Sequence, residues 1–306
     1  VQAADLSIEA RERDEDHRSL IWAGAGSGGG AGAAAVGGST VVNTVVNDLE
    51  ATLDGADVNV GGDVSVETKA GVEIRALTFS VGGAGTAAVT GSMTVNTIAN
   101  RSVASVANAT IGSGGLYVRA TDEMEDGSAG SSIWSAAGNA GGAGAAAAGA
   151  AAASNTVTNT LAATVEASQL SVSETTVVEA LEHVEILTAS ADGAGAGAAA
   201  VGGSASVNNI ANTVEAGIRD SSNDRTTNNT AISARDESSI DAIAGTIRGA
   251  GGVGLGAATS INRIGSTVDA YLSGHQGGAY YDARNVVVNA DSAASIRTLA
   301  AGVAGG

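Results

Sequence analysis

The chain contains no proline and no cysteine, and only seven of its residues are aromatic: two Trp, four Tyr and one Phe. The lack of cysteine excludes disulfide bonds and thiolate metal sites, although it does not fix the cellular compartment. A conventional core of Leu, Ile and Phe cannot be built from this composition. Alanine and valine supply most of the apolar content, and glycine occurs 45 times in 306 residues. Any core must therefore be thin, with backbones that approach each other closely.

Basic side chains are also scarce, since 14 Lys and Arg face 32 Asp and Glu, for a net charge of −18. Such a chain repels phosphate backbones and anionic membrane surfaces, so nucleic acid is not an expected partner. Residues 134–165 carry no charge, but their Gly, Ala, Ser, Asn and Thr offer few large aliphatic groups to drive insertion into lipid. We therefore expect no membrane insertion. The first residues are charged and show no secretory signal.

One asparagine motif recurs five times, as NTVVN, NTIAN, NTVTN, NNIAN and a weaker NRIGS. The spacings between the first asparagines of successive copies are 53, 59, 53 and 54 residues. A Gly-Ala-Gly triplet begins thirteen residues before each of these asparagines. The chain is thus a tandem array of five repeats of about 54 residues, a period typical of stacked repeat architectures.

The asparagines fall on the apolar face when each motif is read as a strand, in which alternate residues share a face. In the fourth copy, Asn208, Ile210 and Asn212 share one face, whereas Glu215 lies on the other. A buried amide needs hydrogen-bond partners, and parallel strands about 4.8 Å apart allow identical amides to form a ladder. The alternative is that asparagine marks turns, but two turns four residues apart in every copy is less economical. The predicted ladder residues are Asn43, Asn47, Asn96, Asn100, Asn155, Asn159, Asn208, Asn212 and Asn262.

The Gly-Ala segments before the motifs are also predicted to be strands. The alanine run within 145–153 favours a helix by propensity, but the glycines of the sister copies would cost a helix about 1 kcal/mol each. Their small side chains would let neighbouring sheets pack closely. The predicted close-packing glycines are Gly30, Gly32, Gly83, Gly85, Gly142, Gly144, Gly195, Gly197, Gly249 and Gly251. The fold expected from these patterns is an all-β, parallel β-solenoid with a thin Gly/Ala core and internal asparagine ladders.

We treat residues 1–306 as a single repeat array. The repeat cores are predicted at about 22–53, 79–106, 134–165, 187–218 and 247–272, with a partial unit at 298–306. The array begins in a connecting segment and stops within a unit, which suggests a slice of a longer solenoid. We expect one wide coil per repeat, because a shift of half a period finds no similar sequence; two coils per repeat is the alternative.

No motif in the chain predicts a catalytic, cofactor or metal site. The glycines at 24–29 match a GxGxxG pattern, but the sequence that follows reads as strand rather than helix. Acidic clusters at 11–17 and 121–127 do not follow the EF-hand pattern and are expected to form a solvated rim. The three histidines are scattered, and the threonine columns of the outward face are too interrupted for an ice-binding plane. We therefore expect the chain not to be an enzyme.

The unit GAGAGAAAVGGSASVNNIANTVEAGI (193–218), followed by V-x-V-x-A segments, resembles the repeats of large bacterial exoproteins. These are the filamentous-haemagglutinin-like and leukotoxin-like proteins, many of them adhesins exported by two-partner secretion. The resemblance covers the whole chain and implies a right-handed solenoid, an extracellular or cell-surface location, and a structural or adhesive role as a stalk or filament. The implied partners are further copies of the repeat, in the chain or by self-assembly, and host or cell-surface glycans. Two alternatives stay open: a presenting scaffold of a secreted toxin, and a carbohydrate-active β-helix enzyme.

Overall fold

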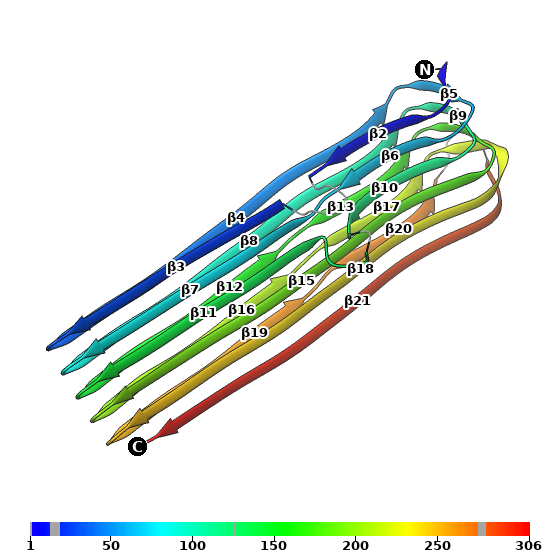
Figure 1. The fold of residues 1–306 in the computed structure, drawn as a ribbon. Helices are drawn as coiled ribbons and strands as arrows, with labels where there is room; N and C mark the ends of the chain where they lie inside the picture. The colour runs from blue at the N-terminus through cyan, green and yellow to red at the C-terminus, as the bar shows by residue number, and fades with distance from the viewer. Residues whose placement is uncertain (1, 13–18, 125, 275–279) are drawn as a thin grey trace.

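The computed structural model describes residues 2–12, 19–124, 126–274 and 280–306 (Figure 1). Its regular elements are β-strands throughout, which confirms the all-β prediction, including strand structure in the Gly-Ala segments. No helix capable of crossing a membrane occurs in the described ranges. The strands stack in parallel into sheets that nearly close on themselves, as in a parallel β-solenoid.

The chain passes through three layers in each turn of its path. The short layer holds β1 (Gln2–Ala3), β5 (Asp57–Val60), β9 (Thr110–Ser113), β14 (Gln169–Val172) and the start of β18 (Ser222–Ala250). The second layer holds β2 (Leu6–Arg11), β3 (Ser19–Ala31), β6 (Val64–Lys69), β7 (Val72–Ala84), β10 (Leu116–Asp122), β11 (Ser131–Ala143), β15 (Thr175–Ala196), the rest of β18 and β21 (Tyr281–Gly305). The third layer holds β4 (Ala34–Asp54), β8 (Ala87–Ala107), β12 (Ala146–Val157), β13 (Thr160–Glu166), β16 (Ala199–Ile210), β17 (Thr213–Arg219), β19 (Val253–Ile264) and β20 (Thr267–Ser273).

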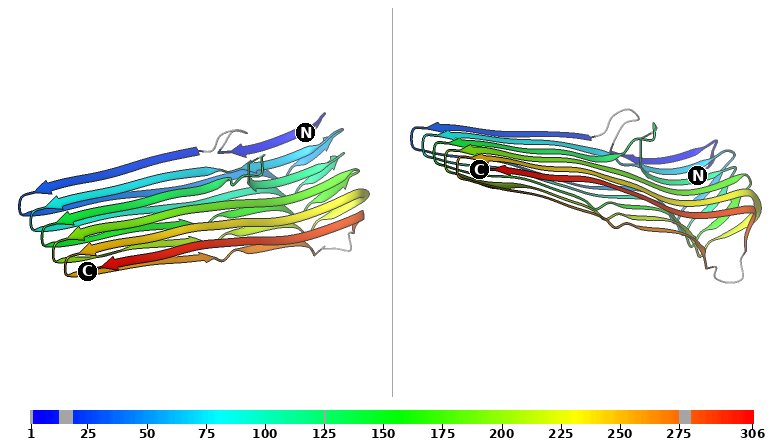
Figure 2. Two further views of the ribbon diagram at one scale, coloured as in Figure 1. Left: turned by 60° about the horizontal axis from the view of Figure 1, so that its bottom comes forward. Right: turned by 90° about the horizontal axis from the view of Figure 1, so that it is seen from below.

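The second and third layers face each other along their whole length (Figures 1 and 2). At the Gly/Ala end they are joined by tight turns, and at the opposite end the short layer separates them. We call these the glycine end and the short-strand end. A 21-residue strand such as β4 is about 70 Å long at about 3.3 Å per residue, whereas five stacked strands occupy only about 24 Å. The long dimension in Figure 1 is therefore the strand direction, and the stack itself is short.

Consecutive repeats lie directly beside one another in the sheets. Asn43 pairs in register with Asn96, which pairs with Asn155, and the same register continues through Asn208 to Asn262. The one longer spacing, 59 residues between Asn96 and Asn155, has a local cause. β10 ends at Asp122 and β11 begins only at Ser131, so the acidic stretch at 121–127 runs from the end of β10 into the intervening loop. The other predicted acidic cluster, at 11–17, lies largely outside the described residues.

The core becomes thinner from the short-strand end to the glycine end. The largest cluster, next to the short layer, contains Ile111, Leu161 and Ile218 together with many valines. A second cluster of isoleucines and valines fills the middle of the coil. Beyond it, the core is reduced to alanines such as Ala137 and Ala151. Side-chain size along the strand thus sets the distance between the two layers.

Candidate functional site

The first asparagine of each motif belongs to one continuous side-chain column inside the solenoid. Each Nδ2 donates to the Oδ1 of the next asparagine, at 2.8, 2.8, 2.8 and 2.7 Å from Asn43 through Asn96, Asn155 and Asn208 to Asn262. The three central amides are each 1% exposed. Hydroxyl groups of the facing layer add further bonds to the column. These amides are therefore buried at little cost, because their donors and acceptors are paired.

Replacing Asn208 with leucine should lower the free energy of unfolding by about 1–3 kcal/mol, because buried groups that bond to it lose their partner. Its Oδ1 accepts from Asn155 and Thr188, and its Nδ2 donates to Asn262. Asn209→Leu is the matched control, since this neighbouring amide is partly exposed on the opposite face and should change stability by only about 0.5 kcal/mol. Urea denaturation measures both. Equal losses at the two positions would contradict a role for the column in stability.

The second asparagine of each motif is bonded in a different way from the ladder that the sequence predicts. The Oδ1 atoms of Asn159 and Asn212 accept from the backbone N–H of the preceding coil's asparagine, at 3.0 and 3.1 Å. Their Nδ2 groups donate across the solenoid to carboxylates: Asn159 to Asp122 and Glu182, and Asn212 to Asp236. The prediction of an amide-to-amide ladder is wrong for this column, because the facing layer places carboxyl oxygens opposite these amides and the Nδ2 groups donate to them.

These carboxylates form a buried acidic column that sequence reasoning missed. Asp122, Glu182 and Asp236 lie side by side on β10, β15 and β18, and none is more than 1% exposed. Glu12, at the N-terminal edge, accepts a hydrogen bond from Asn47 in the same way. Asp122 ends an alternating run of inward residues that includes Val118 and Ala120, whereas Glu182 and Asp236 lie within longer runs of the same kind. An acid at the inward position of such a run was the signal in the sequence.

The electrostatic environment favours the protonated form of two carboxyl groups in this column, those of Glu182 and Glu12. Burial and the neighbouring charges of Asp122 and Asp236 raise the pKa of Glu182 well above its usual range. Burial, with a contribution from Asp122, raises the pKa of Glu12 to about 7. Both effects have the same origin, because a dry interior penalises the charged form and a nearby like charge penalises it further.

Stability should therefore fall as the pH rises. The pKa of Glu182 is near 4.5 in the unfolded chain and well above 4.5 in the folded chain. Below pH 4.5 the side chain is protonated in both the folded and the unfolded chain, so its contribution to the free energy of unfolding is fully present. As the pH rises from 4.5 to the pKa of the folded state, the unfolded chain releases this proton first. The free energy of unfolding therefore falls, and the contribution of Glu182 to it is lost. Between these two pKa values, the urea denaturation midpoint should fall less steeply with pH for Glu182→Gln than for the unmodified chain.

Glu185→Gln, at an exposed position on the same strand, is the control and should leave this pH dependence unchanged. If Glu182→Gln also left it unchanged, the raised pKa would not belong to Glu182.

A buried ion pair lies nearer the glycine end. Arg248 on β18 and Asp192 on β15 pair with each other, and both side chains are 0% exposed. Asn139 on β11 donates to Asp192 at 2.5 Å. Space for these side chains comes from glycines of the facing layer, since a Cβ at Gly202 would overlap the Arg248 guanidinium and one at Gly149 would overlap the Asn139 amide. Large polar side chains and facing glycines thus compensate each other in volume.

The ten predicted close-packing glycines differ in what an added Cβ would meet. A Cβ at Gly85, Gly144, Gly197 or Gly251 would overlap a carbonyl oxygen of the preceding coil, so these turns do require glycine. Gly32, in the first turn, has nothing within 4 Å. For the other five the prediction is wrong, because they point to the outer surface and an added Cβ would meet nothing closer than 3.9 Å. These five are Gly30, Gly83, Gly142, Gly195 and Gly249.

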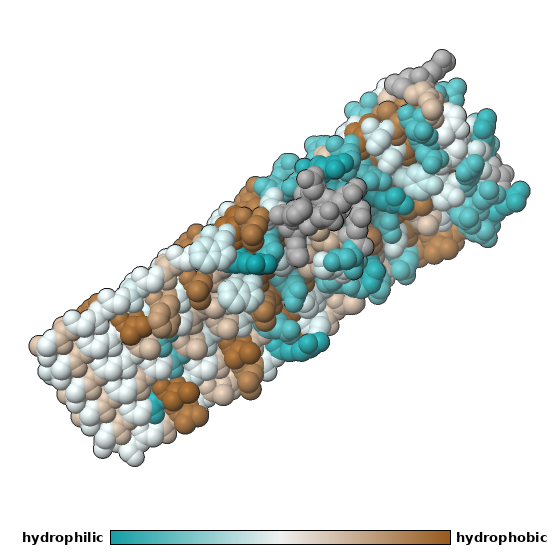
Figure 3. All heavy atoms as spheres, viewed as in Figure 1, coloured by the Kyte–Doolittle hydropathy of each residue, from teal (hydrophilic) through white to brown (hydrophobic). Residues whose placement is uncertain are grey.

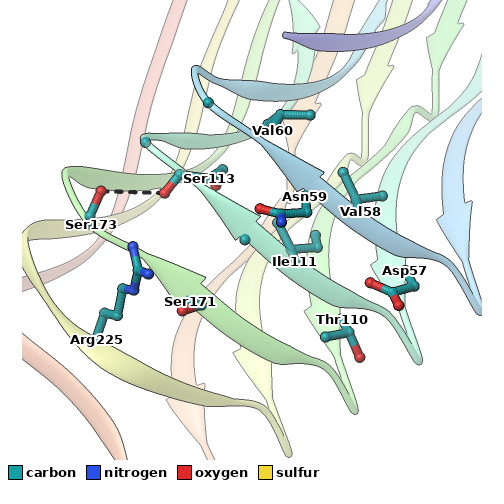
Figure 4. A pocket seen from close by; sticks show the side chains of 13 residues that line it. Asp57, Val58, Asn59, Val60, Thr110, Ile111, Ser113, Ser171, Ser173 and Arg225 are labelled. Carbon is teal, nitrogen blue, oxygen red and sulfur yellow. Dashed lines mark hydrogen bonds between the residues drawn. The ribbon is translucent and has the colours of Figure 1, made fainter. Parts of the chain in front are cut away.

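A groove of about 480 Å³ runs over the short layer, lined by residues of β5, β9, β14 and β18 (Figure 4). Asn59, Ser171 and Ser173 give it a polar wall, and Arg225 extends over it from β18. Asp57 is the one carboxylate among its lining residues. Glycoside hydrolysis usually uses two carboxyl groups on either side of the scissile bond, so this groove supplies binding groups rather than such a pair.

The outer surface divides along the strands. Charged and polar side chains gather over the short-strand end, whereas the glycine end shows Gly, Ala and exposed aliphatic groups (Figure 3). Val36 and Ile247, on opposite outer faces of the glycine end, are 81% and 69% exposed. No group of three or more His, Asp or Glu side chains in the described part is arranged to hold a metal.

Comparison of the chain with known protein families, with curated proteins and with solved structures finds no match. The function is therefore argued from the residues and the fold.

Proposed function

We propose that this chain is a structural or adhesive segment of an extracellular stalk or fibre in a large bacterial surface exoprotein. The observation that carries the proposal is the column from Asn43 to Asn262, which places the same amide at the same point of five successive coils. An array of this kind grows in length by adding identical levels, without a new type of contact. The likeness of the repeats to those of filamentous-haemagglutinin-like and leukotoxin-like exoproteins supports the same role. We also propose a right-handed path, the hand of nearly all parallel crossovers.

The direction of the hydrogen bonds suits a load-bearing fibre. Backbone hydrogen bonds in a parallel sheet run between strands and hence along the axis of the stack. β4 pairs with β8 along all 21 of its residues, and β15 pairs with β18 over 22. A pull along the axis is therefore shared by two long ladders at each level. The buried asparagine column adds a third row of bonds in the same direction.

The surface is consistent with two kinds of partner. The uncharged faces at the glycine end carry exposed aliphatic groups such as Val36 and Ile247, which favour further copies of the repeat beside or beyond this segment. The groove of the short layer offers amide, hydroxyl and guanidinium groups, the types of group that bind saccharide hydroxyls and carboxylates. We propose cell-surface glycans as ligands of this groove.

Electron microscopy of engineered chains tests the fibre proposal. Chains with 5, 10 and 15 repeats, built by joining copies of this segment, should keep a width of about 70 Å and grow by about 4.8 Å for each added repeat. A particle whose width changes with repeat number, or whose length stays constant, would overturn the proposal.

A glycan array followed by a reducing-end assay on every glycan bound separates adhesion from catalysis. Binding without release of reducing ends is expected for an adhesive segment. Arg225→Ala and Asn59→Ala should weaken binding, whereas Arg101→Ala, on the exposed face of β8, should not. Release of reducing ends by the unmodified chain would favour the carbohydrate-active enzyme instead.

A further inference from the structure

Both tryptophans of the chain lie on the outer face of the second layer. Trp22 on β3 is 68% exposed, and Trp134 on β11 is 42% exposed. They are the only tryptophans among seven aromatic residues. A tryptophan side chain is usually well buried, and where it stays at the surface it is enriched in binding interfaces. Two exposed indoles on one face of the sheet therefore indicate a surface that binds a partner.

The two tryptophans occupy the same position on strands that are two levels apart. β7 lies between β3 and β11 (Figure 1), and its Arg75 pairs in register with Trp22 on one side and Trp134 on the other. Because neighbouring strands are about 4.8 Å apart, the Cα atoms of the two tryptophans are about 9.6 Å apart along the axis of the stack. An added Cβ at Gly24 would be 3.3 Å from Cη2 of Trp22, so this indole lies along its own strand, over the glycine.

A cleft of about 400 Å³ opens over β7, with one indole on each side. Besides Trp22 and Trp134, its lining residues are Glu73 and Arg75, whose side chains form an ion pair at 2.6 Å between Oε1 and Nε. The cleft thus combines aromatic walls with a floor that offers both hydrogen-bond donors and acceptors. The ion pair also balances its own charge, in contrast with the net charge of −18 on the chain.

Saccharide rings fit these groups. The face of an indole carries partial negative charge, and the C–H groups on the face of a pyranose ring carry partial positive charge, so the two stack. Sugar hydroxyls both donate and accept hydrogen bonds, and can therefore bond to Glu73 and to Arg75 at the same time. A proline-rich peptide also docks in aromatic grooves, but proline has no N–H and offers the carboxylate no donor. The balanced charge of the cleft favours a neutral polymer.

We propose that this cleft binds an extended, neutral β-1,4-linked polysaccharide whose chain runs along the axis of the stack. Successive rings of such a chain are turned over, so alternate rings present the same face, at a spacing close to that of the two indoles. Trp22 stacks on one ring and Trp134 on the next ring but one, while the ring between them lies over Arg75. This site shares no lining residue with the groove of the short layer, and it does not depend on the proposed role as a fibre.

Tryptophan fluorescence reports directly on the cleft, because both tryptophans of the chain line it. Titration of the full chain with cellohexaose should shift the emission to shorter wavelength, since the sugar displaces water from the indoles. Trp22→Ala and Trp134→Ala should each weaken binding, measured by isothermal titration calorimetry, at least about tenfold, because loss of an aromatic anchor commonly has an effect of this size. Circular dichroism checks that both variants fold, as expected for changes at exposed positions.

Phe79→Ala is the matched control, because this ring is 48% exposed on the same face but does not line the cleft. It should bind cellohexaose like the unmodified chain. Maltohexaose, an α-linked and coiled chain of the same sugar, should bind at least about tenfold more weakly, because it cannot reach both indoles at once.

Arg225→Ala separates this site from the groove of the short layer, and should leave cellohexaose binding unchanged. Binding lost in Arg225→Ala but kept in the tryptophan variants would overturn the cleft as a site and support the groove. The proposal would also fail if cellohexaose did not bind, if maltohexaose bound equally well, or if a proline-rich peptide gave the larger fluorescence shift. None of these results bears on the growth of the particle with repeat number, which tests the fibre separately.

Discussion

Replacing Asp192 with asparagine should lower the free energy of unfolding by about 3–5 kcal/mol, because it leaves the charge of Arg248 buried without its partner. Both side chains are 0% exposed. The guanidinium keeps one bond, from Nη2 to the carbonyl oxygen of Gly149 at 3.1 Å, which does not neutralise it. The new amide retains an oxygen that can accept from Asn139, so the loss reports the charge rather than the hydrogen bond. Urea denaturation monitored by circular dichroism gives the measurement.

A second substitution separates the charge from the packing. Asp192→Asn combined with Arg248→Met should restore most of the lost stability, because a buried ion pair replaced by uncharged groups of similar volume is often neutral. Asp241→Asn is the surface control: its partner Arg297 is 80% exposed at 3.8 Å, and such pairs contribute less than about 1 kcal/mol. The ion pair is unimportant if the single Asp192 variant is as stable as this control.

Replacing Gly144 with alanine should destabilise the chain by about 3 kcal/mol, at the upper end of the usual cost of overpacking. The added Cβ would overlap the carbonyl oxygen of Gly85 in the preceding coil. Backbone cannot rotate away as a side chain can, so the turn must shift and the hydrogen bond from Gly144 N to Ala84 O, at 3.2 Å, must lengthen. Thermal and urea unfolding both report this loss.

Gly142→Ala is an unusually close control, because it lies two residues away and an added Cβ there meets nothing within 4 Å. Both changes reduce the entropy of the unfolded chain equally, so their difference isolates the clash. Gly142→Ala should therefore be within about 0.5 kcal/mol of the unmodified protein. Similar stabilities for the two variants would mean that the coils are not held as closely at the turns as the structure indicates.

The groove and the buried ion pair show what sequence reasoning missed beyond the acidic column. The groove joins residues of four successive coils, among them Asn59, Ser171 and Arg225, and no single stretch of sequence carries that combination. Arg248 stands where a charged residue is expected to face solvent, and its burial depends on Gly202 and Gly256 in the facing layer. Contacts between layers have no fixed spacing in the chain, so periodicity cannot reveal them.

The sequence by itself determined the features that depend on register along one strand. The repeat spacing aligned Asn43 with Asn96, and the two-residue period of a strand placed both on the inward face; their side-chain bond at 2.8 Å follows from those two facts. Only the tertiary structure decided the features that depend on the facing layer. Asn159 has the same parity as Asn155, yet it bonds to Asp122 and Glu182 rather than to its own kind. Gly142 and Gly144 share one triplet, yet only Gly144 meets a backbone oxygen. The physical reason is that parity and spacing act within a chain segment, whereas charge, volume and close approach depend on what the second layer places opposite.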